Sequence, residues 1–117
     1  MQTKAQQLCD WYDICDEHDL VSNSGVCALI GEQQIAIFTV DWQERRQLYA
    51  LSNGDPVGKA NVMYRGIIGS VDAKPVVASP LYKEHYCLAT GQCLENEDLA
   101  LQVFAVELNA GKVRVAL

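Results

Sequence analysis

The stretches Asn53–Gly58 (Asn-Gly-Asp-Pro-Val-Gly) and Ser79–Tyr86 (Ser-Pro-Leu-Tyr-Lys-Glu-His-Tyr) decide the fold of this chain. Each places a proline among small or polar residues, a composition that favours loops over strands and helices. An apolar segment of β type precedes each stretch, ending at Ser52 before the first and at Ala78 before the second. The sequence therefore predicts two loops that each begin where a strand ends.

Short β-strands dominate the rest of the pattern, with turn signals between them. Gly31-Glu32 is expected to form a type II′ hairpin turn, Asp41–Arg46 a polar loop and Asn53–Tyr64 a long loop. The expected strands are Trp11–Cys15, Val26–Ile30, Gln33–Val40, Gln47–Ser52, Ile67–Val71, Pro75–Ser79, Tyr86–Ala89, Val103–Leu108 and Lys112–Ala116.

Helix signals are weak. One turn is expected within Asp16–Val21 and another within Asn96–Leu101, where Asn96 would be the N-cap. The pattern thus predicts an all-β fold, a sandwich or small barrel with two protruding loops and at most one or two short helical turns. We expect a single domain over residues 1–117, with residues 1–9 as a flexible tail.

The charge balance excludes several classes of partner. The 117 residues carry a formal net charge of −6, with nine basic side chains spread along the chain. Nucleic-acid binding needs clustered Lys and Arg to displace counterions from phosphates, and anionic membranes attract basic segments in the same way. We therefore expect neither a nucleic acid nor a membrane as partner.

The cysteines and the N-terminal segment indicate a compartment. The cysteine count is five, which is odd, and no pair has the C-x-x-C spacing of a zinc or redox site. No secretory signal and no apolar run long enough to span a bilayer is visible. We expect a soluble cytoplasmic protein whose cysteines stay reduced.

Together, the two loops resemble the cluster-binding loops of a Rieske iron–sulfur domain. The segment Tyr86-x-Leu88-x-Thr90-Gly91 strengthens the resemblance, since it is similar to the aromatic–Leu–Thr-Gly turn that follows the second loop in that family. The resemblance extends over residues 10–117 and implies a Rieske-like fold of the sandwich or small-barrel type.

The positions of the metal ligands, however, are substituted. A Rieske cluster needs Cys-x-His in one loop and Cys-x-x-His in the other. The corresponding residues here are Asp55, Val57, Ser79 and Tyr82. Val57 has no donor atom, and the hydroxyls of Ser79 and Tyr82 ionise only at high pH. Because Fe–S clusters favour thiolate, we expect no cluster, no other cofactor and no catalytic residue in this chain.

Within Rieske-like domains, the chain resembles the small subunit of the assimilatory NAD(P)H nitrite reductase. The features that it shares are Asp55-Pro56 in the first loop and Ser79-Pro80-Leu81 in the second. That resemblance implies a non-catalytic subunit that binds and supports a large subunit, in a complex that reduces nitrite to ammonium. FAD, a [4Fe–4S] cluster and siroheme are then expected in the large subunit. The alternatives are a cofactor-free interaction module of another complex and a [2Fe–2S] electron carrier.

Three groups of residues are candidates for docking a partner, because Trp, Tyr and Arg are enriched at protein interfaces. The alternative for the first group is an ordinary polar loop with Trp42 folded back on the sheet. The groups are Trp42 with Arg45 and Arg46, Tyr64 with Arg65, and Tyr82 with Lys83.

Other residues that could carry chemistry have simpler interpretations. His85 and Cys87 would share one face of a strand, but no acidic residue of recognisable spacing completes a catalytic triad. The acidic turn Asp16–Asp19 around His18 lacks the spacing of a calcium loop. We expect both to be structural or solvated.

Overall fold

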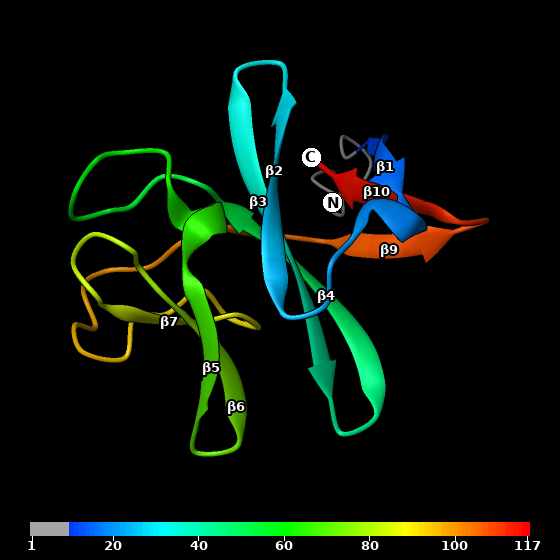
Figure 1. Cartoon of the computed structure of the whole chain (residues 1–117). Coiled ribbons are helices and arrows are strands. Elements are labelled where there is room, and N and C mark those ends of the chain that lie inside the picture. The colour runs from blue at the N-terminus through cyan, green and yellow to red at the C-terminus, as the bar shows by residue number, and fades with distance from the viewer. Residues whose placement is uncertain (1–9) are drawn as a thin grey trace, which may run out of the picture.

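Ten short strands and two single 3-10 turns make up the described part of the chain (Figure 1). The computed structural model describes residues 10–117, so the tail expected at residues 1–9 lies outside the described residues. The strands are β1 (Trp11–Asp16), β2 (Ser24–Ile30), β3 (Gln33–Trp42), β4 (Arg45–Ser52), β5 (Ile67–Val71), β6 (Lys74–Ala78), β7 (His85–Cys87), β8 (Val103–Phe104), β9 (Val106–Asn109) and β10 (Lys112–Ala116), and the 3-10 turns are η1 (Glu17–Asp19) and η2 (Met63–Arg65). No helix among these residues is long and apolar enough to cross a membrane.

The strands form three antiparallel sheets, ordered β1-β10-β9, β2-β3-β4-β8 and β5-β6-β7. The middle sheet packs against both others, and every side chain from Ile35 to Val40 on β3 is buried. Burial on both faces explains why this strand is a continuous apolar run rather than an alternating one. The expected all-β fold is confirmed, and the sheets formed by residues 10–117 are not closed into a barrel.

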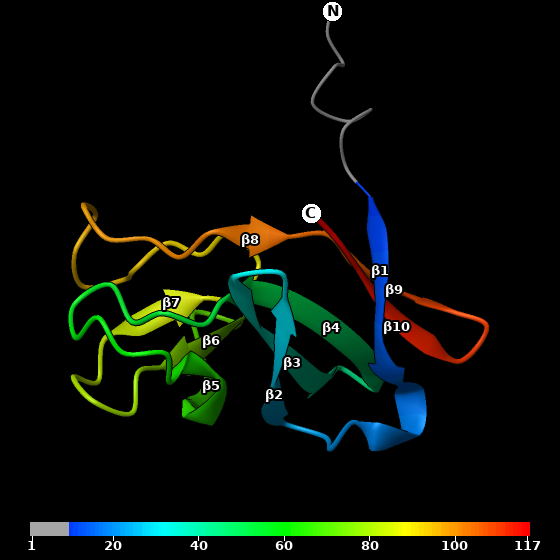
Figure 2. The same cartoon turned by 90° about the horizontal axis from the view of Figure 1, so that it is seen from above.

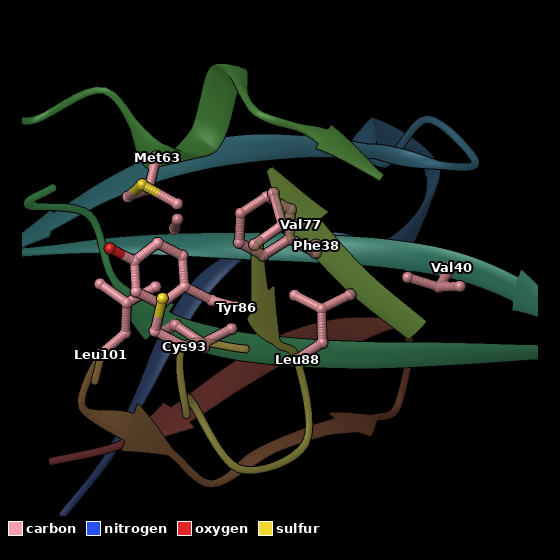
Figure 3. Close-up of a cluster of buried hydrophobic side chains, with 10 residues drawn as sticks. Phe38, Val40, Met63, Val77, Tyr86, Leu88, Cys93 and Leu101 are labelled. Atoms are coloured by element: carbon pink, nitrogen blue, oxygen red, sulfur yellow. The ribbon is translucent and has the colours of Figure 1, made fainter. Parts of the chain in front are cut away.

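Two cores lie on the two faces of the middle sheet, because successive side chains of β3 point in opposite directions. Ile35 and Ile37 face the sheet of β1, β10 and β9, where they meet Val113 and Val115 in the second core. The first core lies between the middle sheet and β5–β7 (Figure 3). It contains Ala36, Phe38, Val40, Leu51, Met63, Val77, Tyr86, Leu88, Cys93 and Leu101.

The hairpins agree with the sequence in one case and differ in another. Gly31 has φ +61° at the first turn position between β2 and β3, as a type II′ turn requires. The loop expected over Asp41–Arg46 is wrong, because β3 and β4 extend through most of it and leave a two-residue turn. Gln43 and Glu44 both have positive φ there, as in a type I′ turn, although neither is the glycine or asparagine that signals one.

Both expected turns are present, although only the first is a 3-10 helix. The turn within Asp16–Val21 forms as η1. Within Asn96–Leu101 a single hydrogen-bonded turn forms: the N–H of Leu99 donates to Asn96 O at 3.1 Å, and Asn96 Oδ1 accepts the N–H of Asp98 at 2.9 Å, as an N-cap does. The turn does not continue into a helix, since Leu99 O accepts the N–H of Cys93 and the N–H of Leu101 donates to Gly91 O. The turn η2, at the end of the first long loop, was not predicted.

Three loops project side by side at one end of the molecule, as both views show (Figures 1 and 2). The first, residues 53–62, follows β4, and the second, residues 79–84, follows β6. The third, residues 94–100, lies between β7 and β8. We call these three loops the loop end. Both stretches that the sequence identified as loops lie there.

Candidate docking site at the loop end

A hydrogen bond between buried side chains joins the first and second loops. Asp55 and Ser79 are each about 1% exposed, and the Ser79 hydroxyl donates to Asp55 Oδ2. The other carboxylate oxygen, Oδ1, accepts the backbone N–H groups of Val57 at 2.8 Å and Gly58 at 3.2 Å. The Ser79 oxygen in turn accepts the N–H of Leu81 at 3.2 Å. Two of the four residues that the sequence predicts at ligand positions therefore hold the loops together.

The base of the first loop is organised by Asn53, which is fully buried. Its Nδ2 donates to the carbonyl of Asn61 at 3.0 Å and to Gln34 Oε1 at 3.2 Å. Its Oδ1 accepts the N–H of Tyr64 at 2.8 Å. One side chain thus closes the loop on itself and ties it to β3, which the sequence did not reveal because asparagine is common in any loop.

The tip of the two loops is apolar and exposed, unlike the bond beneath it. The ring of Tyr82 lies over Gly58, where a Cβ would come within 2.7 Å of Tyr82 Cε2. Tyr82 is 55% exposed, and Val57 and Leu81 are also exposed. The solvent-exposed ring of Tyr82 therefore packs against the backbone of Gly58.

Two lysines accompany this apolar tip. Lys59 and Lys83 are exposed and both have positive φ, 62° and 68° respectively. Positive φ is uncommon outside glycine, and it is held here by backbone bonds from Lys59 N to Asp55 O at 2.8 Å and from Lys83 N to Ser79 O at 3.1 Å. The tip is thus basic and apolar on a chain whose net charge is −6.

The third loop is held against the second by His85 and Glu95. The backbone N–H of His85 donates to Glu95 Oε1 at 2.8 Å, and His85 Nδ1 lies 2.7 Å from Glu95 Oε2. The backbone N–H of His85, followed by its ring, lowers the pKa of Glu95 below its ordinary value. His85 and Glu95 therefore attach the third loop to the start of β7.

Cys87 and Tyr86 belong to the structure beneath the loops. Burial favours the thiol form of Cys87, but hydrogen bonds from Thr90 and its backbone outweigh it, so that the pKa is lowered. Tyr86 is fully buried in the first core, and its hydroxyl has no partner among the described residues (Figure 3). Burial raises the pKa of this tyrosine, so it stays neutral.

These residues do not fit a [2Fe–2S] cluster. Such a cluster needs four thiolate or imidazole ligands, whereas Asp55 and Ser79 are already bonded to each other and to backbone N–H groups. Val57 offers no donor atom. Among the cysteines of the described chain, Cys87 and Cys93 lie nearest in sequence to the second loop. Both are buried, Cys93 in the first core and Cys87 beside it.

The structure separates the predicted docking residues. Tyr82 and Lys83 lie at the loop end. Tyr64 and Arg65, on η2, form their own pair, with the Arg65 guanidinium 5.4 Å from the ring centre of Tyr64 and its Nε donating to the Tyr64 hydroxyl at 2.9 Å. This pair lines a hollow on the side of the molecule, next to β5.

The third predicted group lies on the β3–β4 hairpin, away from the loop end (Figure 1). Arg46 is engaged within the chain, since its Nη2 donates to Ser22 Oγ at 3.2 Å. Arg45 is exposed at the start of β4. Trp42 ends β3, and its side chain lies outside what the structure describes. The three groups therefore do not form one surface.

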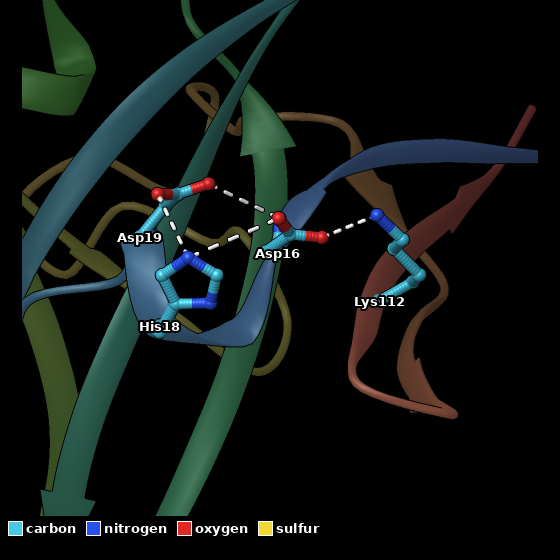
Figure 4. A network of polar contacts seen from close by, with 4 residues as sticks. All are labelled: Asp16, His18, Asp19 and Lys112. Atoms are coloured by element: carbon cyan, nitrogen blue, oxygen red, sulfur yellow. Dashed lines mark hydrogen bonds and ion pairs between the residues drawn. The ribbon is translucent and has the colours of Figure 1, made fainter.

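The acidic turn also has a structural explanation (Figure 4). Ligand atoms of Asp16, His18 and Asp19 lie within 4.8 Å of one another. Asp16, however, pairs with the ammonium group of Lys112, and Asp19 accepts the backbone N–H of Asp16 at 3.2 Å. Asp16 and Asp19 thus cap η1, and Asp16 joins it to β10.

The fold and the loops place the chain in a class of proteins. Residues 10–116 match the family model of the Rieske-like [2Fe-2S] domain, so the chain belongs to that family. Within it, the chain is homologous to the small subunit of NADH nitrite reductase. It is 35% identical over 108 residues to the nitrite reductase (NADH) small subunit of Escherichia coli K12, which covers 92% of this chain and 98% of that protein.

Two further comparisons agree with this assignment. The NMR structure of the E. coli protein NirD is 34% identical, with a TM-score of 0.82, over 94% of this chain and 98% of that chain. A region forming 11% of the nitrite reductase [NAD(P)H] large subunit of Klebsiella oxytoca is 37% identical over 105 residues, or 90% of this chain. A domain like this one therefore also occurs as part of a larger polypeptide.

Proposed function

We propose that this chain is the non-catalytic small subunit of a cytoplasmic NAD(P)H nitrite reductase, in which it binds and supports the large subunit. The complex would reduce nitrite to ammonium during nitrate assimilation, with FAD, a [4Fe–4S] cluster and siroheme carried by the large subunit. The observation that carries the proposal is the use of Asp55 and Ser79 to close the loops of a homologue of nitrite reductase small subunits. The scaffold is kept although its ligand positions have another role.

The relative from Klebsiella oxytoca supports the choice of partner. In that protein a matching domain is part of the polypeptide called the large subunit. A covalent link holds the two parts at a high effective concentration, so contacts between them need not be strong. A separate chain such as this one must instead bind through a surface of its own.

We place that surface at the tip of the loop end. Tyrosine is one of the three residue types enriched among interface anchors, and Tyr82 lies on the backbone of Gly58 with Val57 and Leu81 beside it. Lys83 and Lys59 add positive charge. The partner surface is expected to be apolar at its centre and acidic around it.

Reconstitution tests the function. The large subunit is purified with and without this chain, and NAD(P)H-dependent nitrite reduction and co-elution are measured. We expect co-elution and a higher or more durable activity with the chain present. No co-elution together with unchanged activity would contradict the proposal, and capture of an unrelated complex at native expression would favour a general interaction module.

Variants of the tip test the surface itself. Tyr82→Ala is expected to weaken binding of the large subunit about tenfold, as for an interface anchor, and Lys83→Glu to weaken it several-fold. Tyr82→Phe keeps the ring and serves as the matched control, as does Lys74→Glu, which changes an exposed lysine at the start of β6. Equal binding by all four variants would show that the docking surface lies elsewhere on the chain.

The cofactor content has its own measurement. We expect anaerobically purified protein to contain no stoichiometric iron and to show no Rieske-type visible absorption, because the loop positions offer neither thiolate nor imidazole. An iron content of two per chain with such a spectrum would establish an electron carrier instead.

A further inference from the structure

A hollow of about 630 Å³ lies between β1 and β2, away from the loop end. Its walls are apolar, with Tyr12 and Ile14 on β1 and Val26, Ala28 and Ile30 on β2. All of these except Tyr12 are partly buried against the second core. The hollow is therefore the place where the apolar interior between two sheets reaches the surface.

The two sides of this sandwich differ. On one side the chain passes from β8 in the middle sheet directly into β9 in the outer sheet (Figure 2). The carbonyl of Ala105, at that crossing, accepts the N–H of Ala116 at 3.0 Å. On the other side β1 and β2 are joined only beyond one end, through η1 and residues 20–23. The sandwich is closed on the first side and open on the second.

Both walls of the opening are edge strands. Among residues 10–117, β1 pairs only with β10, and β2 pairs only with β3. The backbone groups on their outer edges are free to pair with an extended segment, which is how many peptides add to a sheet. The C-terminal half of β2 is the accessible half, because η2 packs against Gly25 near its start.

The charges at the opening indicate what kind of segment fits. Asp13 and Asp19 are the charged residues among those that line it, and no basic side chain of residues 10–117 does. Arg114 Nε lies 3.3 Å from Asp13 Oδ1, so Asp19, whose side chain is 57% exposed, is the carboxylate left to attract a partner. A second copy of this chain would bring the same carboxylates and a net charge of −6 to the contact, which disfavours self-association. A segment with aliphatic side chains and a Lys or Arg is complementary to both the apolar walls and the negative charge of the opening.

We infer that the opening between β1 and β2 is a second interaction surface, which receives an extended aliphatic segment with a basic residue from the large subunit. This inference rests on the proposed function for the identity of the partner. It adds a contact of different chemistry from the tip of the loop end, where the partner is expected to be acidic. Two contacts of opposite charge preference would fix the orientation of the two subunits.

A matched pair of variants on β1 tests the opening. Trp11 and Tyr12 are adjacent and both 40% exposed, but they point to opposite faces of β1, and Tyr12 lines the opening. Tyr12→Asp places a carboxylate in the apolar wall and is expected to weaken binding of the large subunit about tenfold. Trp11→Asp adds the same charge outside the opening and is expected to change binding less than twofold. Thermal unfolding of both variants verifies that they are folded.

Thiol footprinting gives a second readout that needs no substitution. Cys15 and Cys27 line the opening, and burial raises the pKa of both thiols, so alkylation with iodoacetamide is done at mildly alkaline pH. Peptide mapping is expected to show alkylation of both slowed at least fivefold in the complex with the large subunit. Cys87, which is buried and lies outside the opening, should stay unreacted in both samples and so reports any unfolding during the reaction.

The outcomes separate this inference from the proposed function. A complex that forms normally with Tyr12→Asp, and in which Cys15 and Cys27 react as in the free chain, overturns the second surface and leaves the proposed function intact. Absence of any complex overturns both. Protection of the two thiols by self-association of the chain alone, detected by sedimentation, would assign the opening to a second copy and also overturn the inference.

Discussion

Two carboxylates on opposite sides of the molecule accept hydrogen bonds from neighbouring side chains, but their surroundings differ. Asp55 is about 1% exposed and accepts the Ser79 hydroxyl together with two backbone N–H groups. Asp16 pairs with the ammonium group of Lys112, and its side chain is 35% exposed (Figure 4). Water can replace the partner of Asp16, whereas nothing replaces the partners of Asp55.

The comparison explains why Asp55 and Ser79 form a matched pair. A buried polar side chain must have its hydrogen bonds satisfied within the protein, and these two side chains satisfy each other. An exposed pair such as Asp16 and Lys112 carries no such constraint. We therefore expect substitutions at the loop end to cost much more stability than equivalent changes around η1.

The largest effect is expected for Asp55→Ala. The change removes the acceptor of the Ser79 hydroxyl and of two backbone N–H groups, and we expect the free energy of unfolding to fall by about 3 kcal/mol. Urea denaturation measures it. Asp55→Asn retains an acceptor and should recover about half of the loss. A loss below about 1 kcal/mol for Asp55→Ala would mean that water satisfies these donors and that the pair is not sealed.

A smaller effect is expected for Ser79→Ala, at about 1 to 2 kcal/mol, because Asp55 keeps its backbone donors. In the double variant the two losses should be less than additive, since both changes break the same bond. Additive losses in a double-mutant cycle would show that the two side chains stabilise their loops independently.

Acid is expected to weaken the attachment of the third loop. The pKa of Glu95 is lowered from an ordinary value of 4.5, chiefly by the backbone N–H of His85. A lowered pKa in the folded state means that the stabilisation is present above the ordinary pKa and is lost as the pH falls through the folded value. Stability measured between pH 6 and pH 3 should decline less steeply in Glu95→Gln. Identical pH profiles for the two chains would show that Glu95 does not cause the loss of stability in acid.

The smallest effect is expected for Lys112→Ala. Its ammonium pairs with Asp16 in solvent, where ion pairs contribute little and are screened by salt. We expect an unfolding midpoint within error of the unchanged chain at 0.15 M salt. A clear loss of stability that persists in 1 M salt would contradict the distinction between the two carboxylates.

Much of the fold could be predicted from the sequence, because strand alternation and turn residues are local signals. The turn at Gly31 and the two loops with their prolines are examples. The turn at Gln43-Glu44 could not be predicted, since neither residue type favours positive φ. The turn capped by Asn96 was also predicted, and it ends after one turn because Leu99 O and the N–H of Leu101 bond to residues 91–93.

The site was harder to predict than the fold. Sequence reasoning identified Asp55 and Ser79 as former ligand positions but could not show that they bond each other across 24 residues. The role of Asn53 depends on burial, which a single sequence does not report. The opening between β1 and β2 depends on which strands are edges, and that is set by the pairing of β1 with the C-terminal strand β10. In each case the sequence lacks the same information, namely which distant segments pair and in which register.

Hydrogen exchange of the chain, alone and bound to the large subunit, tests the central claim most directly. We expect the amides of residues 81–83, at the exposed tip, to be strongly protected in the complex, while those of residues 109–112, at the β9–β10 turn, exchange at unchanged rates. The amides of Val57 and Gly58 should already exchange slowly in the free chain, because they donate to the buried carboxylate of Asp55. Fast exchange there in the free chain, with no protection of the tip in the complex, would contradict a sealed loop end that docks the partner.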